Sequence, residues 1–217
     1  MSAKDSWLKN LMLQKGGFWD DLYWYDLQLE RRLPQAHTML QQLVLSMPPC
    51  GDKQVLDLCA GSGRVSAAVL AAYPTAQFTL IDASKQRLTM ARQRLDPQKI
   101  TTHVMTLTPN DSIQFCSQES MDLVVACLAF HVLVEQPSHY AQTRDEEELD
   151  VENTYELFFR ATWRALRPGG HVVFGDHVGQ LGMFQQLEAL KRVGFEDVDC
   201  SWRVDDSFVA GGRKPLA

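Results

Sequence analysis

The sequence lacks a surplus of positive charge: its 217 residues include 21 Lys and Arg against 27 Asp and Glu, for a formal net charge of −6. Surfaces that follow a nucleic-acid backbone normally need clustered Lys and Arg. The charge balance therefore disfavours a nucleic-acid partner and favours a small-molecule one. The hydrophobic content of 45% and charged content of 22% are ordinary for a globular domain of this length.

Paired cysteine motifs and long apolar runs are also missing. The five cysteines are scattered and include no C-x-x-C pair, so neither a disulfide framework nor a zinc site is indicated, and we expect no metal. No apolar run is long enough to cross a bilayer, and the first residues lack the basic-then-apolar pattern of a secretory signal. We expect a cytoplasmic protein that does not associate with a membrane.

The stretch 55–64 (VLDLCAGSGR) organises the rest of the chain. Its apolar residues predict a buried parallel strand, and Gly61 and Gly63 allow a sharp turn into a helix of small residues. A dinucleotide fingerprint would place a third glycine where this chain has Ser66. Instead, Asp57 stands four residues before Gly61, where its carboxylate can anchor an ammonium group.

A second acid follows at the distance that a βαβ unit predicts. The run 77–81 (QFTLI) reads as a strand that ends in Asp82, roughly 20 residues past the glycines. An acid at that strand tip can accept hydrogen bonds from both hydroxyls of a ribose. A nucleotide-binding unit with another ligand, or with none, is the alternative reading.

Together, Asp57, Gly61, Gly63 and Asp82 resemble the first motifs of the class I S-adenosylmethionine (SAM) dependent methyltransferases. The run 166–170 (LRPGG), followed by a strand, is another mark of that class. The resemblance covers the chain from residue 19 onward and implies SAM as cofactor and S-adenosylhomocysteine as product. It also implies an α/β fold: a doubly wound, mostly parallel seven-stranded sheet with helices on both faces and an antiparallel C-terminal strand.

The resemblance divides the chain into a segment 1–17, which we expect to be at best partly ordered, and one methyltransferase domain, 18–217. Within that domain we expect a helical cap over 18–50 and an insertion over 132–150 that can serve as a lid. The expected strands are 55–58, 77–81, 101–107, 121–127 and 171–176, followed by an antiparallel pair over 195–202 and 208–211.

Relatives carry an N-terminal segment similar to residues 25–34, whose aromatic and basic side chains cover the methionine end of the cofactor. Packing on the sheet is the other interpretation of this aromatic face. For the adenine contact, Asp111 and the backbone near Leu107 are the two candidates. The cofactor-binding residues that the motifs and the resemblance imply are Tyr25, Arg32, Asp57, Cys59, Ala60, Gly61, Gly63, Asp82, Ala83, Leu107 and Cys127.

For the acceptor side, the strand over 121–127 should end beside the first strand, which brings His131 near the transferred methyl group. An imidazole titrates near neutral pH, so His131 is the candidate general base for an O–H or N–H nucleophile. A histidine bonded only to the backbone is the alternative. The candidate substrate-binding residues are Trp24, His131, Tyr140 and His177.

We therefore expect methyl transfer to O or N of a small molecule. Two other readings stay open. The C-terminal half also resembles methyltransferases that act on RNA or proteins, and the carboxy-SAM synthase of tRNA modification. A noncatalytic SAM-binding subunit is the second, because a fold does not guarantee its reaction.

Overall fold

The computed structural model describes residues 22–110, 113–135 and 151–216. The chain divides into two compact units, Met1–His37 and Thr38–Ala217. The first unit contains helix α2 (Leu22–Arg32). The segment 1–17 lies outside the described residues, and the single domain 18–217 with its cap over 18–50 stays a prediction.

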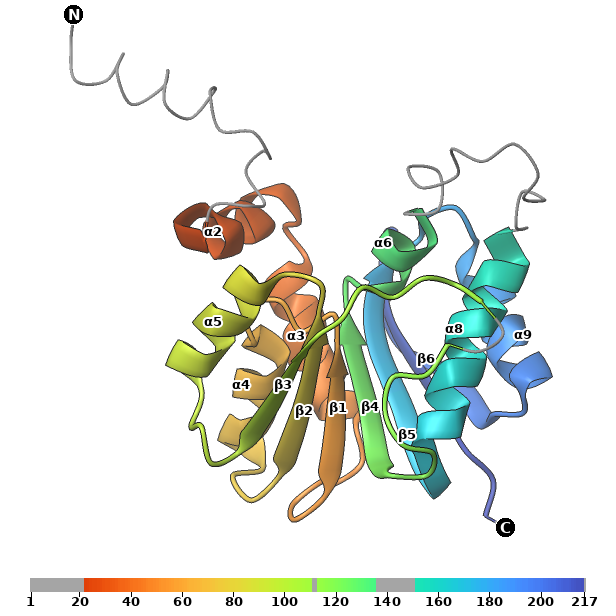
Figure 1. Ribbon diagram of the computed structural model, residues 1–217. Coiled ribbons are helices and arrows are strands. Elements are labelled where there is room, and N and C mark those ends of the chain that lie inside the picture. The colour runs from red at the N-terminus through yellow and green to blue at the C-terminus, as the bar shows by residue number, and fades with distance from the viewer. Residues whose placement is uncertain (1–21, 111–112, 136–150, 217) are drawn as a thin grey trace, which may run out of the picture. The chain divides into compact units, whose positions relative to one another are not determined.

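The second unit is built on a seven-stranded sheet with the order β3-β2-β1-β4-β5-β7-β6 (Figure 1). Its strands are β1 (Gln54–Leu58), β2 (Gln77–Asp82), β3 (Ile100–Val104), β4 (Met121–Cys127), β5 (Leu166–His177), β6 (Glu196–Val204) and β7 (Ser207–Arg213). The helices that follow α2 are α3 (Ala36–Ser46), α4 (Arg64–Ala72), α5 (Lys85–Arg94), α6 (Phe130–Glu135), α8 (Val151–Ala165) and α9 (Met183–Val193). The predicted fold is confirmed.

The strand order creates a switch point between β1 and β4. β1 pairs in parallel with β2 on one side and with β4 on the other. β7 then lies antiparallel to both β5 and β6. Because the connections leave β1 in opposite directions, the carboxyl ends of β1 and β4 open side by side, where doubly wound sheets bind their ligands.

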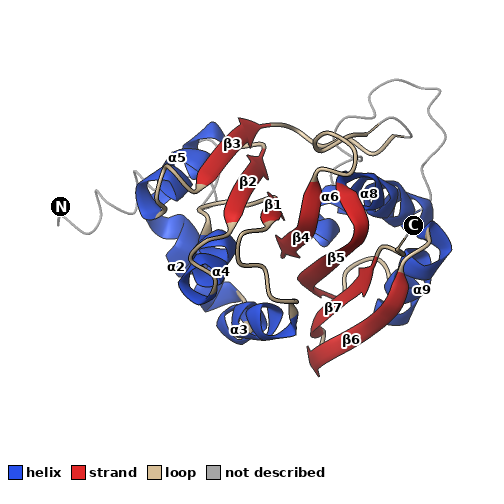
Figure 2. Ribbon diagram, turned by 90° about the horizontal axis from the view of Figure 1, so that it is seen from below, coloured by secondary structure: helices blue, strands red, loops and turns tan. Residues whose placement is uncertain are grey.

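Two hydrophobic clusters cover the two faces of the sheet. Alternate strand residues belong to opposite clusters, so Leu56 and Leu58 face one layer while Val55 faces the other. Helices α3, α4 and α5 supply side chains to the cluster of Val55, and α6, α8 and α9 to that of Leu56 (Figure 2). By the same alternation, Asp57 points toward the α4 layer.

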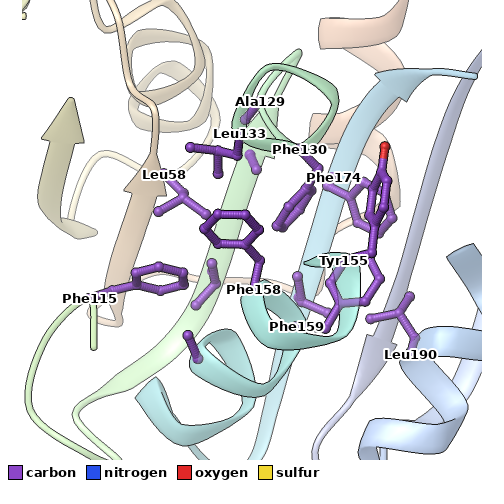
Figure 3. Close-up of a cluster of buried hydrophobic side chains, with 14 of the residues drawn as sticks. Leu58, Phe115, Ala129, Phe130, Leu133, Tyr155, Phe158, Phe159, Phe174 and Leu190 are labelled. Carbon is purple, nitrogen blue, oxygen red and sulfur yellow. The ribbon is translucent and has the colours of Figure 1, made fainter. Parts of the chain in front are cut away.

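Aromatic contacts fix α6 against the sheet. Phe130 lies edge-on to Phe159 of α8 and to Phe174 of β5, with ring centroids 5.1 Å apart in both pairs (Figure 3). All three rings are fully buried. Such edge-to-face pairs contribute roughly 0.5–1.5 kcal/mol each beyond the area that they bury. They hold the start of the short helix α6 at a defined place along β5.

Two predicted strands differ from the structure by more than two residues at one end. The strand expected over 101–107 ends at Val104, although the amide of Met105 still donates to the carbonyl of Asp82. The fifth strand begins at Leu166, five residues before its predicted start. Its pairing with β4 shifts register across the Pro-Gly-Gly segment, where Gly169 has φ +78°, the value that the third residue of a type II turn requires.

Candidate active site

The glycine turn after β1 closes as predicted. Gly61 and Gly63 have φ of +54° and +77°, a region that residues with a Cβ atom adopt only with strain. Gly63 is also the N-cap of α4, and a Cβ atom there would lie 2.9 Å from that of Ala91. Arg94 of α5 donates to the carbonyl and the hydroxyl oxygen of Ser62 at 2.8 and 2.9 Å. The turn is therefore held by a neighbouring helix.

Asp57 is the most unusual acid of the site. It is 1% exposed, and its Oδ2 accepts from the hydroxyl of Ser66 at 2.6 Å and from the Ser66 amide at 3.2 Å. Its Oδ1 is buried and has no hydrogen-bond partner among the described residues. Burial raises the pKa of Asp57 to about 7, against the lowering effect of the two Ser66 hydrogen bonds. A buried oxygen that lacks a donor fits an ammonium ligand.

Asp82 is held at the tip of β2 by the two loops that meet there. Its Oδ2 accepts from the amide of Gly61 at 2.9 Å, and its Oδ1 accepts from the amide of Ser84 at 2.8 Å. Arg87 lies 3.7 Å from the same carboxylate. Each carboxylate oxygen keeps a second lone pair for a ligand, so Asp82 can both position the glycine turn and accept a ribose hydroxyl.

Three carboxylates gather around Cys59. Burial is the main reason that the pKa of this thiol is raised well above its ordinary value, and the charges of Asp82, Asp57 and Asp176 raise it further. SAM carries a sulfonium and an ammonium group, so a site ringed by carboxylates suits its charge.

The ends of the two central strands are strained. Cys59 and Leu128, just past β1 and β4, have φ of +57° and +56° without being glycine. Such conformations cost about 1–3 kcal/mol each and cluster at functional sites. Here they lie at the switch point, where the chain leaves both strands beside the predicted ligand.

His131 forms a close pair with Asp176, near the carboxyl end of β5, the strand next to β4. Their Nδ1 and Oδ1 atoms are 2.5 Å apart, and the side chains are 13% and 1% exposed. The backbone amides of His131 and His177 also donate to Asp176, at 3.2 and 2.9 Å. The ring of His177 lies 4.0 Å from that of His131. The imidazole is therefore oriented by a buried carboxylate.

The remaining predicted cofactor residues of the second unit lie at the ends of β1, β2 and β4 or in the loop after β3, and their contact with a cofactor stays a prediction. Ala60 is buried behind the glycine turn, and Ala83 is exposed at the bend after β2. Cys127 ends β4, and burial raises the pKa of its thiol to about 12. The side chain of Leu107 is 5% exposed and belongs to the hydrophobic cluster. An adenine contact at this residue would therefore be made by its backbone.

Other predicted residues cannot be placed in the site. Tyr25 and Arg32 belong to helix α2 of the first unit, so their cofactor role stays a prediction. The side chain of Trp24, and Asp111 and Tyr140 as a whole, lie outside the described residues. In the insertion expected over 132–150, residues 132–135 continue helix α6, and the rest is likewise not described.

Sequence reasoning missed the roles of Ser66 and Asp176. Ser66 stood out only as the absent third glycine, yet its hydroxyl bonds Asp57. Asp176 was visible as an acid at the end of the fifth strand, and its position next to the switch point could have marked it. Its pairing with His131 depends on a contact between positions 45 residues apart, which no local pattern encodes.

A separate cavity of about 140 Å³ lies against the middle of β5 and the neighbouring strands β7 and β6. Its wall contains none of the predicted site residues. It is lined by Ser46, His171, Val172, Val173, Asp197, Asp199, Ser201, Ala210, Gly211, Gly212 and Arg213.

The sheet order, the glycine turn and the two strand-end acids are those of the class I fold of SAM-dependent methyltransferases. Residues 55–145 match the family model described as a methyltransferase domain. The chain is 30% identical over 137 residues to the ribosomal RNA small subunit methyltransferase B of Xylella fastidiosa (strain 9a5c), an alignment that covers 62% of this chain. It spans about a third of that relative, 32% of its length.

Solved structures share the fold. The SAM-dependent methyltransferase from Mesorhizobium loti matches with a TM-score of 0.60 and 19% identity, over 80% of this chain and 96% of that one. A chain from the complex between the Haloferax volcanii Trm112 methyltransferase activator and a methyltransferase matches with a TM-score of 0.62 and 18% identity, over 88% and 93%. The predicted class and its cofactor, SAM, are thus confirmed at the level of family and fold.

Proposed function

We propose that this protein binds SAM at the carboxyl ends of β1, β2 and β4 and transfers its methyl group to an O–H or N–H acceptor. Bound SAM supplies a methyl group already activated on a sulfonium. The chain's task is then alignment, exclusion of water and removal of the acceptor proton. Asp57 binds the ammonium end, Asp82 binds the ribose, and the glycine turn between them admits the nucleoside without Cβ atoms.

The observation that carries the catalytic part is the 2.5 Å separation of His131 Nδ1 and Asp176 Oδ1. A neutral imidazole that donates its Nδ1 proton to a carboxylate has its lone pair on Nε2, where it can accept a proton. The buried carboxylate also stabilises the imidazolium that forms. His131 is therefore the base, and Asp176 is the positioning residue. His177, beside both, is proposed to contact the acceptor.

For the acceptor, the net charge of −6 supports a small molecule over a nucleic acid. RNA is the second candidate, and the similarity to a ribosomal RNA methyltransferase favours it. Methyltransferases with different acceptors share one fold and its cofactor motifs, so this similarity does not by itself assign the acceptor.

The described residues contain no helix with the length and apolarity that a membrane crossing needs. A cytoplasmic location remains a proposal.

The test has two stages. Calorimetry with SAM and S-adenosylhomocysteine should show saturable binding to the folded protein, and its absence would end the proposal. Transfer from radiolabelled SAM is then measured on a panel of hydroxylated and amino metabolites and, separately, on ribosomal RNA at low and high salt. Labelled metabolite supports the small-molecule acceptor, whereas salt-sensitive labelling of RNA alone would replace it. SAM binding with no labelled product would leave a noncatalytic subunit.

The base is tested with His131→Ala at saturating SAM. We expect kcat to fall by about 100- to 10,000-fold, the usual contribution of a general base. The matched control is His103→Ala, an exposed histidine on the edge strand β3, which should leave kcat unchanged. Unchanged turnover in a folded His131→Ala protein would remove this residue as the base.

A further inference from the structure

The imidazoles of His131 and His177 and the carboxylate of Asp176 are also side chains of the kind that bind metal ions. His131, Asp176 and His177 each offer one ligand atom, and these atoms all lie within 4.8 Å of one another. Among the residues that the structure describes, they form the group of three such side chains gathered closely enough to hold an ion. We propose that these residues form a binding site for one divalent transition-metal ion of the zinc type.

Rotation of the imidazoles has to bring the three ligand atoms to the distances that a single ion needs. Nitrogen and oxygen ligands lie about 2.0–2.2 Å from zinc, so two ligands of one tetrahedral ion are about 3.4 Å apart. The ligand atoms of the three side chains lie within 4.8 Å of one another, which exceeds the tetrahedral separation by about 1.4 Å at most. His131 and His177 are both half-buried, and rotation about their side-chain bonds moves the ring nitrogens over such distances.

The carboxylate of the group is already oriented. Asp176 is 1% exposed, and the backbone amides of the two histidines donate to its oxygens at 3.2 and 2.9 Å. Hydrogen bonds of this kind fix metal-binding carboxylates and sharpen affinity. A polar carboxylate buried between two imidazoles also gives the site the negative charge that a dication requires.

The donor set selects the kind of ion. Two imidazoles and one carboxylate suit Zn²⁺, Co²⁺ or Fe²⁺, whereas Mg²⁺ and Ca²⁺ prefer oxygen ligands throughout. Three protein ligands leave a coordination position for a water or an acceptor oxygen, as in catalytic zinc sites.

Cobalt provides the probe, because its absorption reports both stoichiometry and ligand type. The full chain is treated with a chelator, the chelator is removed, and the protein is titrated with Co²⁺ in the absence of SAM and acceptor. We expect visible absorption that saturates at one ion per chain and disappears when Zn²⁺ is added. His177→Ala should weaken Co²⁺ binding by more than about tenfold, whereas His103→Ala should not change it.

Circular dichroism and thermal melting confirm that the His177→Ala protein is folded. Asp176→Asn, which keeps the size of the side chain, is the second variant and should weaken binding similarly. The proposal is overturned by the absence of saturable absorption, by unchanged affinity in folded His177→Ala protein, or by an intense near-ultraviolet band that identifies thiolate ligands. No methyl transfer is measured, so these outcomes are independent of the proposed function.

Discussion

Burial of the Asp57 carboxylate destabilises the folded protein at neutral pH, and the same carboxylate is proposed to bind the ammonium group of SAM. Burial raises its pKa from 3.8 to about 7, so the folded protein binds this proton more tightly than the unfolded chain. The contribution of Asp57 to the free energy of unfolding is therefore highest below about pH 4. It falls as the pH rises from about 4 to 7 and stays constant above that. An ammonium ligand reverses the preference because it favours the carboxylate.

Replacement of Asp57 should therefore have opposite effects on stability and binding. Asp57→Asn removes the buried charge, so the melting temperature at pH 8 should rise. SAM affinity should fall and lose its pH dependence below pH 7, whereas in the parent protein it should increase about fivefold between pH 6 and 7, where the carboxylate fraction rises and the ammonium of SAM stays protonated. Calorimetry at pH 6 and 7 and thermal melting at pH 8 measure this.

The control for this change is Asp206→Asn, an exposed acid in the turn before β7. It should change neither the pH dependence of SAM affinity nor the melting temperature at pH 8. Equal pH dependence in the Asp57→Asn and parent proteins would show that another group titrates.

Asp176 is predicted to act through His131. In Asp176→Asn, the amide cannot balance the imidazolium charge and can favour the wrong tautomer, so kcat should drop by about 100- to 10,000-fold. KM for the acceptor should change little, because ground-state binding is not the interaction removed. A pH profile of kcat is the deciding measurement. A drop caused by misfolding would instead appear in the melting temperature and in SAM binding.

At the scale of elements, helix α6 positions the base. Phe130 opens the helix and packs on Phe174 of β5, so the next residue along α6, His131, meets Asp176, two residues further along the strand. Phe174 and Asp176 have the same parity on β5 and thus face the same layer. The aromatic contact between Phe130 and Phe174 therefore places the proposed base beside its carboxylate.

Loss of the Phe130 ring contacts should lower kcat by more than the loss of folded protein accounts for. Phe130→Leu removes both edge-to-face contacts of α6 and should cost about 1–3 kcal/mol, with a fall in kcat because His131 moves from Asp176. The matched variant is Phe208→Leu on β7, which loses its contact with Phe174 but leaves α6 untouched. Denaturant unfolding and turnover are measured for both. Equal kcat in the two variants would contradict this role of α6.

Patterns local to the chain predicted most of these elements. The apolar run of β4 and the glycines after β1 each encode their own geometry. Ser84 also acts locally, because serine favours helix N-caps and its side chain caps α5 by accepting from the amide of Arg87. The start of β5 was not predictable. The Pro-Gly-Gly segment is a turn signal in the sequence, whereas in the folded sheet it lies inside β5, where the pairing with β4 shifts register. Asp176 was hidden for the same reason: its role exists only after β5 and α6 meet.

At the scale of the whole molecule, the described residues of both hydrophobic clusters belong to the second unit. One cluster begins at Met39 and the other at Leu56, after the boundary between Met1–His37 and Thr38–Ala217. Stability and cofactor binding can therefore be separated by truncation. Removal of residues 1–35 leaves helix α3 intact from its first residue, Ala36.

We expect the truncated protein to melt within a few degrees of the full chain, because the buried clusters are retained. SAM affinity should fall if Tyr25 and Arg32 cover the methionine end, as the family resemblance implies. Tyr25→Ala and Arg32→Ala in the full chain should each reproduce part of that fall, whereas Glu30→Ala, an exposed position on the same helix, should not. Calorimetry with SAM measures all four proteins. An unchanged dissociation constant after truncation would confine the cofactor site to the second unit, held there by the strand-end acids and the glycine turn.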